Sequence, residues 1–214
     1  MIELYDYHRS SASFRVRIAL HLKNIEYTKK EIHLVNNGGE QLSPEYEKIN
    51  SQKLVPTLKD NEKIISQSLA IIEYLDETYG TPILLPKDPY EKAKVKAFAL
   101  HIGADIHPLN NLRVINYLLN DLKISKEQKS AWYQHWIHKG FSALENELKK
   151  SSSYDYCFGN TPSLADIYLV PQMYNAKRFN CDLSDFPRLI NIDAHCQQNP
   201  SFQKAWPNEP PVSS

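Results

Sequence analysis

A proline-rich segment around position 85 separates two stretches of the chain that differ in hydrophobic periodicity. Three prolines fall within residues 81–92, and prolines at this spacing interrupt both helices and strands. Before this segment, short apolar runs alternate with helical patterns, whereas after it apolar residues recur at helical spacing alone. The sequence therefore predicts an α/β domain at residues 1–82 and an all-α domain at residues 83–214.

The first stretch predicts a small mixed sheet with two helices. In chain order the predicted elements are a strand at residues 2–7, a helix from Ser13, a half-buried strand at 25–35, a loop at 36–46, a hairpin of strands at 55–58 and 63–65, and a helix from 66 or 67 to Gly80. The residues between the last two strands, "KDNE", are typical of a tight turn. The predicted order is therefore β-α-β-loop-β-β-α.

The second stretch predicts long helices and no strands. The helical patterns cover residues 90–121, 126–150 and 163–178. Ser125 and Ser163 stand where N-terminal caps are expected, the latter followed by an acidic residue three positions on. The last dozen residues, which end in "PNEPPVSS", predict a loosely held tail.

Composition and charge exclude several classes of protein. Basic and acidic residues number 25 each, so no overall field would attract nucleic acid or an anionic membrane. No window approaches the roughly 20 apolar residues of a membrane span, and the three cysteines lack the C-x-x-C spacing. Free thiols in a reducing cytoplasm are the expectation. His135 and His138 have no cysteine or acidic partner at ligand spacing, so no metal site is expected.

The opening segment "YHRSSASFRVRIAL" holds the first candidate site. Ser10 and Ser11 lie where the predicted strand gives way to a helix, with Arg9 and Arg15 close by. Serine there is a common N-cap, and capping alone would account for it. The alternative is that the serines hold an anion at the positive end of the helix, with the arginines as nearby cations.

Two further candidates lie at strand and helix starts. Pro56 begins a predicted strand, where proline is either an edge residue or part of a cis bond that leaves the Val55 backbone open to an extended ligand. Gln67 and Ser68 open a predicted helix, where they either cap it or bind a ligand carboxylate.

The chain resembles the zeta class of glutathione transferases, whose best known members are maleylacetoacetate isomerases. The resemblance spans nearly the whole chain and is carried by "LYDYHRSSASFRVRIAL", "VPTLKDNEKIISQSLAIIEYLDE", "LLPKDP", "IHPLNNLRV" and "SLADIYLVPQMYNAKRF". It implies a thioredoxin-like, glutathione-binding domain (β-α-β-α-β-β-α), an all-α domain that supplies most of the substrate pocket, and a homodimer.

The resemblance also implies roles for individual residues. Ser10 matches the family's catalytic serine beside the glutathione sulfur, Ser11 is its neighbour, and Val55, before a cis Pro56, pairs with the cysteinyl backbone of glutathione. Further matches are Gln67 and Ser68 at the γ-glutamyl group, Gln41, His107, Asn111, Leu112 and Arg113 at the glutathione or dimer side, and Arg178 at a substrate carboxylate. Arg9 and Arg15 are alternative carboxylate partners. Ala12 replaces the family's cysteine, so any thiol contribution at that position is missing.

The implied reaction is the glutathione-dependent cis–trans isomerisation of maleylacetoacetate to fumarylacetoacetate, in phenylalanine and tyrosine catabolism. Its expected substrate is a small dicarboxylate, and nucleic acid and membranes are not expected partners. Two alternatives are a glutathione transferase that conjugates or dehalogenates small electrophilic acids, and a glutathione-fold module retained for protein binding without catalysis. The complete set of Ser10, Ser11, Gln67 and Ser68 favours an enzyme.

Overall fold

The computed structural model describes residues 1–81, 83–150 and 154–207. Packing divides the chain into a first unit, Met1–Ile83 together with the segment from Asn199, and a second unit, Leu84–Gln198. The described residues from Asn199 thus pack with the first unit, whereas every residue from 83 onward was predicted to belong to the second domain.

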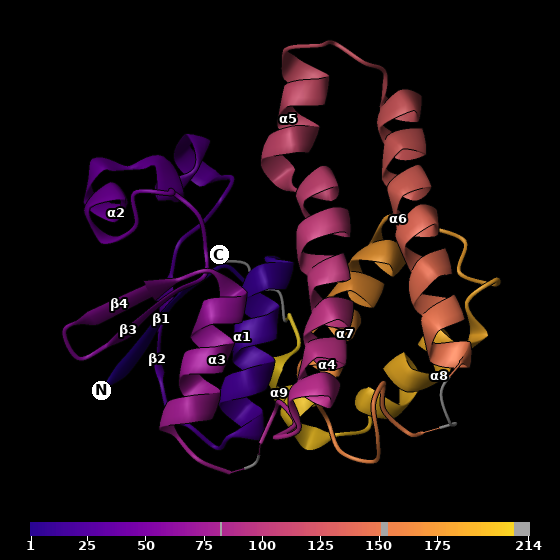
Figure 1. Cartoon of the computed structure of the whole chain (residues 1–214). Helices are drawn as coiled ribbons and strands as arrows, with labels where there is room; N and C mark the ends of the chain where they lie inside the picture. The colour runs from indigo at the N-terminus through magenta and orange to yellow at the C-terminus, as the bar shows by residue number, and fades with distance from the viewer. Residues whose placement is uncertain (82, 151–153, 208–214) are drawn as a thin grey trace. The chain divides into compact units, whose positions relative to one another are not determined.

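A four-stranded mixed sheet forms the centre of the first unit (Figure 1). Its strands are β1 (Ile2–Asp6), β2 (Thr28–Glu31), β3 (Thr57–Asp60) and β4 (Lys63–Ser66), in the order β2-β1-β3-β4. β1 runs parallel to β2 and antiparallel to β3, and β3 and β4 form the predicted hairpin. The prediction for the second strand was wrong in extent and burial. β2 is a strand of four residues at the edge of the sheet. All four residues are exposed, since charged side chains on an edge strand remain in solvent.

Four helices complete the first unit: α1 (Ser11–Leu22), α2 (Pro44–Ile49), α3 (Ser68–Thr78) and α9 (Pro200–Ala205). The first half of α2 lies within the segment predicted as a loop. Ser43 caps it by accepting from the Tyr46 amide at 3.1 Å, and Pro44 occupies the first helical position, where its missing N–H costs nothing.

α9 corrects the prediction of a loose C-terminal tail for residues 203–206. Phe202 and Ala205 of this helix are fully buried, Trp206 packs edge-on against Phe14 at 5.5 Å, and Ser201 donates to the carbonyl of His21 at 3.3 Å. The rest of the predicted tail, residues 208–214, lies outside the described residues.

The described part of the second unit is helical, as predicted (Figure 1). Its helices are α4 (Pro89–Leu100), α5 (Leu112–Asn120), α6 (Lys126–Lys149), α7 (Leu164–Arg178) and α8 (Pro187–Cys196). The single helix predicted at 90–121 is interrupted by a π-helical turn, His101–Ile106, and a 3₁₀ turn, Pro108–Asn110. Pro108 has no N–H to continue the helical hydrogen bonds. Asn111 then caps the next helix, α5, because its side-chain oxygen accepts from the Arg113 amide. α8 was not predicted.

Polar caps anchor the two longest helices of the second unit. Ser125 and Gln128 form a reciprocal capping box at the start of α6. At α7 the buried carboxylate of Asp166 accepts from the Ser163 amide, the Ser163 hydroxyl and the Cys157 amide at 2.8–2.9 Å. Burial nonetheless raises the pKa of Asp166. The three cysteines are free, as expected, and all three are buried. No described helix is long and apolar enough to cross a membrane.

The carboxylate of Asp60 joins the hairpin to α3. Its Oδ2 accepts from the hydroxyls of Tyr79 at 2.5 Å and Tyr74 at 2.8 Å. These hydrogen bonds, that of Tyr79 first, hold the pKa of Asp60 below its usual value, and the pKa of Tyr79 rises to about 12. The ionised carboxylate therefore stabilises the contact between β3 and α3.

We expect Tyr79→Phe to lower the free energy of unfolding at pH 7 by about 1.5 kcal/mol, the contribution of a hydrogen bond to a charged group. Because the pKa of Asp60 is depressed on folding, this contribution is complete above the unfolded-state pKa of about 3.9 and is lost as the pH falls through the folded-state pKa. Urea unfolding at pH 7 and near pH 3 measures both. The control is Tyr27→Phe, because the Tyr27 hydroxyl has no hydrogen bond to a described residue. An equal loss for Tyr79→Phe at both pH values would contradict the account.

Candidate active site

The candidate residues of the first unit follow or precede strands at one end of the sheet. The register pairs Tyr5 with Thr57 and Thr57 with Ser66. The end of β1, the start of β3 and the end of β4 therefore lie side by side. Since β2 runs parallel to β1, with Asp6 opposite Glu31, the segment after β2 begins at the same end. Four loops that are far apart in sequence thus meet where ligands commonly bind α/β sheets.

Ser10 lies between β1 and α1, at the N-cap of the helix. Its Oγ accepts from the Ser13 amide at 3.2 Å, so the capping interpretation of this serine is correct. Within the described chain the Ser10 hydroxyl has no acceptor for its own proton. The hydroxyl can therefore donate to a ligand at the positive end of α1 while it caps the helix. Ser11 is buried in the first turn, and Ala12 follows it half-buried.

Val55 lies two residues before β3. The Val55–Pro56 peptide bond is cis, one of the two states considered for this proline. Neither the N–H nor the C=O of Val55 bonds another described residue. A buried hydrogen-bond network holds the preceding carbonyl instead. The Tyr46 hydroxyl and the Asn50 amide both donate to Leu54 O, at 2.7 and 2.9 Å, and both contact the Thr57 hydroxyl. Val55 thus offers an extended donor and acceptor on a fixed loop.

Gln67 and Ser68 lie at the start of α3, after β4. Gln67 has a positive φ of 72°, and its side chain makes no capping hydrogen bond to α3. The interpretation of Gln67 as a side-chain cap is therefore wrong. Its side chain donates to Gln52 Oε1 at 2.7 Å, which ties the start of α3 to the loop before Val55. Ser68 is buried and accepts from Arg15 Nη1 at 3.4 Å.

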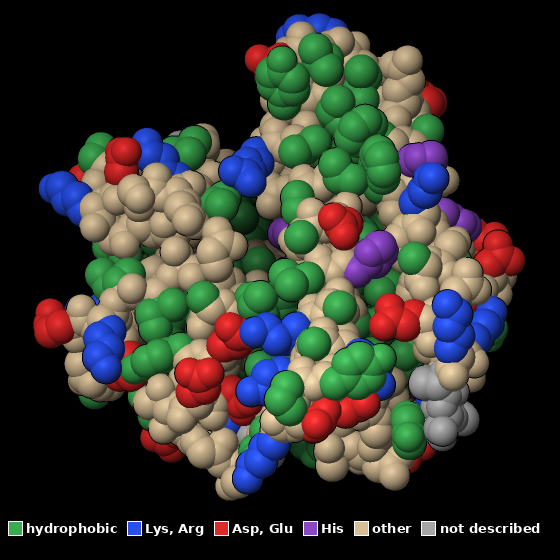
Figure 2. All heavy atoms as spheres, viewed as in Figure 1, with side chains coloured by type: hydrophobic (Ala, Val, Ile, Leu, Met, Phe, Trp, Pro, Cys, Tyr) green, Lys and Arg blue, Asp and Glu red, His purple; other side chains and the backbone are tan. Residues whose placement is uncertain are grey.

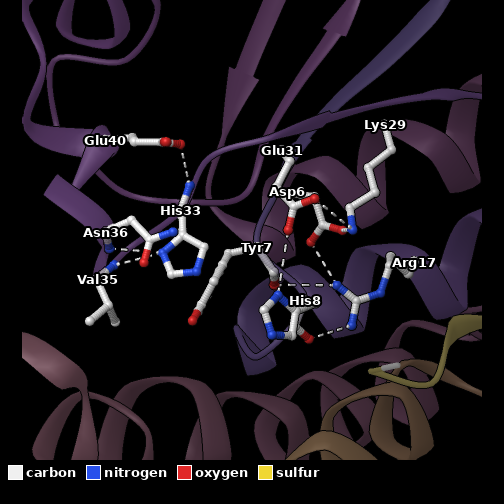
Figure 3. A network of polar contacts seen from close by, with 10 residues as sticks. All are labelled: Asp6, Tyr7, His8, Arg17, Lys29, Glu31, His33, Val35, Asn36 and Glu40. Carbon is white, nitrogen blue, oxygen red and sulfur yellow. Dashed lines mark hydrogen bonds and ion pairs between the residues drawn. The ribbon is translucent and has the colours of Figure 1, made fainter. Parts of the chain in front are cut away.

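Gln41 belongs to the segment that follows β2 and lies in a 3₁₀ turn, Glu40–Leu42. His33 shapes this segment, because its Nδ1 accepts from the amides of Val35 and Asn36 while its own amide donates to the Glu40 carboxylate at 2.7 Å (Figure 3). The Oε1 of Gln41 is buried and bonds no residue in the described ranges. Such an atom is an acceptor that a ligand donor could satisfy.

Side-chain packing and polar contacts connect these loops directly. Tyr7, in the turn before Ser10, forms one buried cluster with Tyr46 and Val55. The ring of Tyr7 also meets the ring of His33 edge-on, at 4.9 Å between centroids (Figure 3). The first unit therefore brings the segments that carry Ser10, Val55, Gln67 and Gln41 together at one end of the sheet.

The four other residues predicted at the glutathione or dimer side belong to the second unit. Asn111 caps α5, and Leu112 and Arg113 are exposed in its first turn. His107 is half-buried and directly follows the π-helical turn. Apolar side chains also gather over α5 and the neighbouring end of α6 (Figure 2), where Leu112, Tyr117 and Leu122 are exposed.

The three candidate arginines differ in exposure. Arg178 ends α7, is exposed, and lies over the Phe179 ring at 4.9 Å. Arg9 is exposed in the turn before Ser10. Arg15 is 2% exposed and directed at Ser68, so it connects α1 with α3. Arg178 and Arg9 are the more accessible cations.

Comparison with known proteins identifies the family. Residues 4–83 match the model of the glutathione S-transferase N-terminal domain, and residues 128–190 match that of its C-terminal domain. The chain is 50% identical over 208 residues to a probable maleylacetoacetate isomerase of Vibrio cholerae, an alignment that covers 97% of this chain and 96% of the relative. A solved maleylpyruvate isomerase, described as a bacterial glutathione S-transferase of the zeta class, superposes with a TM-score of 0.94 at 41% identity, covering 99% of this chain and all of the other.

The chain belongs to the zeta class of glutathione transferases. A second solved structure, maleylacetoacetate isomerase of Methylobacterium extorquens with bound malonate and glutathione, superposes with a TM-score of 0.93 at 31% identity over 99% of this chain and all of the other. As a member of this class, the protein uses glutathione.

The chemistry of the assembled site fits a tripeptide thiol. Ser10 offers a hydroxyl proton, Val55 offers a backbone donor and acceptor, and α3 starts without a side-chain cap from Gln67. A thiolate, a peptide unit and a carboxylate are the groups that such donors and acceptors satisfy.

Sequence reasoning missed the residues that support this site. Tyr46, Asn50 and Gln52 hold the Val55 loop, and His33 and Glu40 hold the Gln41 segment. One signal in the sequence could have located α2 and hence Tyr46, namely a serine followed by proline and acidic residues at 43–47. The other contacts link residues far apart in sequence and carry no local pattern.

Proposed function

We propose that this zeta-class transferase catalyses the glutathione-dependent cis–trans isomerisation of maleylacetoacetate to fumarylacetoacetate. The observation that carries the proposal is the meeting of Ser10, Val55 and the start of α3 at one end of the sheet. The name shared by the Vibrio cholerae and Methylobacterium extorquens relatives supports this substrate. The zeta-class structure named maleylpyruvate isomerase makes maleylpyruvate the second candidate.

Glutathione would be held by residues of the first unit. Val55, after which the chain turns through cis Pro56, would pair with the cysteinyl backbone, since its own backbone groups bond no other described residue. Gln67 and Ser68 would hold the γ-glutamyl end at the N-terminus of α3, whose dipole favours a carboxylate. The buried Oε1 of Gln41 would accept from an N–H of the peptide.

Ser10 would control the protonation state at the reacting sulfur. Bound glutathione supplies a thiolate that adds reversibly to the conjugated double bond, which allows rotation about that carbon–carbon bond. A free thiol has a pKa near 8.5, so a donor that stabilises the anion increases its fraction at neutral pH. The Ser10 hydroxyl donates, Ser11 belongs to the same turn, and α1 contributes about half a positive charge at this end.

The substrate carboxylates would meet exposed cations. Arg178 is the first candidate and Arg9 the second, because both guanidinium groups are accessible and Arg15 is buried against Ser68. His107, Asn111, Leu112 and Arg113 complete the proposed set at the glutathione or dimer side. Ala12 replaces the cysteine of the family's motif, so the proposed chemistry at this turn rests on Ser10 and its neighbour Ser11.

The setting of the enzyme is part of the same proposal. We place it in the cytoplasm, as a homodimer, in phenylalanine and tyrosine catabolism. The buried, unpaired cysteines are compatible with a reducing compartment, and the isomerase names of the relatives support the pathway.

The direct test follows the isomerisation of maleylacetone by absorbance, with and without glutathione. We expect turnover that requires glutathione and that exceeds activity with maleylpyruvate. Chloroacetate and dichloroacetate serve as comparison substrates. Glutathione-dependent consumption of the haloacids without isomerisation would replace the proposal with a conjugating or dehalogenating transferase, and failure to bind glutathione would leave a non-catalytic module.

Ser10→Ala should lower kcat/KM about 100-fold near neutral pH, the effect of removing one preorganised donor to a developing anion. Without this donor the pKa of the bound thiol rises, so the rising limb of the pH profile should move upward by about one unit. Ser13→Ala is the matched control, because the buried Ser13 hydroxyl has no hydrogen bond within the described residues. An unshifted limb in Ser10→Ala would exclude the proposed role.

Arg178→Met and Arg9→Met distinguish the carboxylate partners. Maleylacetone lacks the terminal carboxylate of maleylacetoacetate, so the arginine that meets this group should affect only the larger substrate. We expect Arg178→Met to raise the KM for maleylacetoacetate about tenfold, equivalent to one lost charge-assisted hydrogen bond. The KM for glutathione should stay unchanged. Equal effects on both substrates would assign Arg178 to the carboxylate that they share.

A further inference from the structure

A buried arginine lies directly beneath the turn that carries Ser10. Arg17 is 5% exposed and forms an ion pair with the fully buried Asp6, at 2.6 Å between Nη1 and Oδ1 (Figure 3). Asp6 ends β1 and Arg17 lies in the middle of α1. The pair therefore closes the connection that contains the Tyr7–Ser10 turn.

The direction of the Arg17 side chain follows from helix geometry. Side chains on an α-helix lean toward its N-terminus. An arginine two turns into α1 can therefore reach back to the loop before the helix. Figure 3 shows the guanidinium of Arg17 directed at Asp6 and at the backbone beside His8.

Arg17 bonds the backbone of the turn as well as the carboxylate. The turn is closed by the Ser10 amide, which donates to Tyr7 O at 2.9 Å. Arg17 Nη2 donates to His8 O at 3.1 Å, and Nη1 is 3.5 Å from Tyr7 O. Two successive carbonyl groups are thereby directed toward one guanidinium. Their orientation fixes the path of the chain into Ser10.

The same guanidinium also bonds the C-terminal segment. Arg17 Nε donates to the carbonyl of Ala205 at 2.9 Å, at the end of α9. Three groups are therefore joined through one side chain: the end of β1, the turn before Ser10, and α9. A lysine could retain the charge opposite Asp6, but its single ammonium lacks the planar fork that spans these acceptors.

We propose that Arg17 is a positioning residue for the reaction, because it fixes the Tyr7–Ser10 turn and thereby the direction of the Ser10 hydroxyl. This inference rests on the role proposed for Ser10. Stability alone does not account for the arrangement, since well-packed apolar residues of similar volume often replace a buried ion pair without loss. The bonds to Tyr7 O, His8 O and Ala205 O are specific to a guanidinium.

The test compares Arg17→Lys and Arg17→Met with a matched control at the other end of α1. Lys23 is also buried and pairs with Asp76 at 3.0 Å, so Lys23→Met removes a comparable ion pair far from the turn. Three quantities are measured: amide hydrogen exchange over residues 7–14, glutathione affinity by calorimetry, and the pH profile of kcat/KM. Circular dichroism verifies the fold, and Arg17→Lys serves if Arg17→Met fails to fold.

We expect Arg17→Lys to speed amide hydrogen exchange at residues 8–13 and to shift the rising limb of the pH profile of kcat/KM to higher pH. The value of kcat/KM itself should fall about 10- to 100-fold, the range for a misplaced reacting group. Lys23→Met should lower thermal stability without moving the limb. The inference would be overturned if Arg17→Lys kept the wild-type rates of amide exchange and the wild-type pH profile of kcat/KM. It would also be overturned if Lys23→Met shifted the pH profile as far as Arg17→Lys does. A third outcome separates the two proposals. If Arg17→Lys changes the amide-exchange rates while Ser10→Ala leaves the pH profile of kcat/KM unshifted, the role proposed for Ser10 is wrong, but Arg17 still controls the conformation of the turn.

Discussion

The buried ion pair between Asp6 and Arg17 is the interaction on which the rest of the first unit depends. It joins the last residue of β1 to the middle of α1, and its remaining donors hold the turn before Ser10 and the end of α9. Removing one partner of a buried pair typically costs about 3–5 kcal/mol; without Arg17, the buried Asp6 carboxylate would keep only the Lys29 ammonium, 3.7 Å from its Oδ2. The site and the C-terminal segment therefore share one anchor.

The other parts of the site follow from strand ends and helix starts. The sheet brings together the ends of β1, β2 and β4 with the beginning of β3. Helices α1 and α3 begin at this same end, and each helix start provides N–H groups and a positive dipole for an anionic ligand. Tyr46, Asn50 and Gln52 then hold the connecting loop through side-chain hydrogen bonds. The proposed catalytic chemistry therefore needs no unusual residue. It needs only ordinary hydroxyl and backbone N–H donors that lie together at one end of the sheet.

Local patterns in the sequence predicted several elements correctly and failed at others for identifiable reasons. The β3–β4 hairpin was predicted because the turn residues "KDNE" act locally. The helical second unit was predicted because its periodicity extends over many residues. β2 was predicted too long and too buried, since a mixed apolar and charged pattern does not reveal that a strand lies at an edge. The prediction of one helix over residues 90–121 was wrong because it did not take Pro108 into account, whose missing N–H interrupts the helical hydrogen bonds.

By itself, the sequence determined the class of fold, the hairpin, the candidate residues Ser10, Val55 and Gln67, and the family, because these depend on short motifs and periodicity. Only the tertiary structure decided that these residues share one end of a sheet, that Arg15 is buried against Ser68, and that the segment from Asn199 packs with the first unit. Arg17 shows the reason most clearly. Its partners lie 11, 9 and 188 positions away, and contacts of this kind depend on packing in three dimensions, which no local pattern encodes.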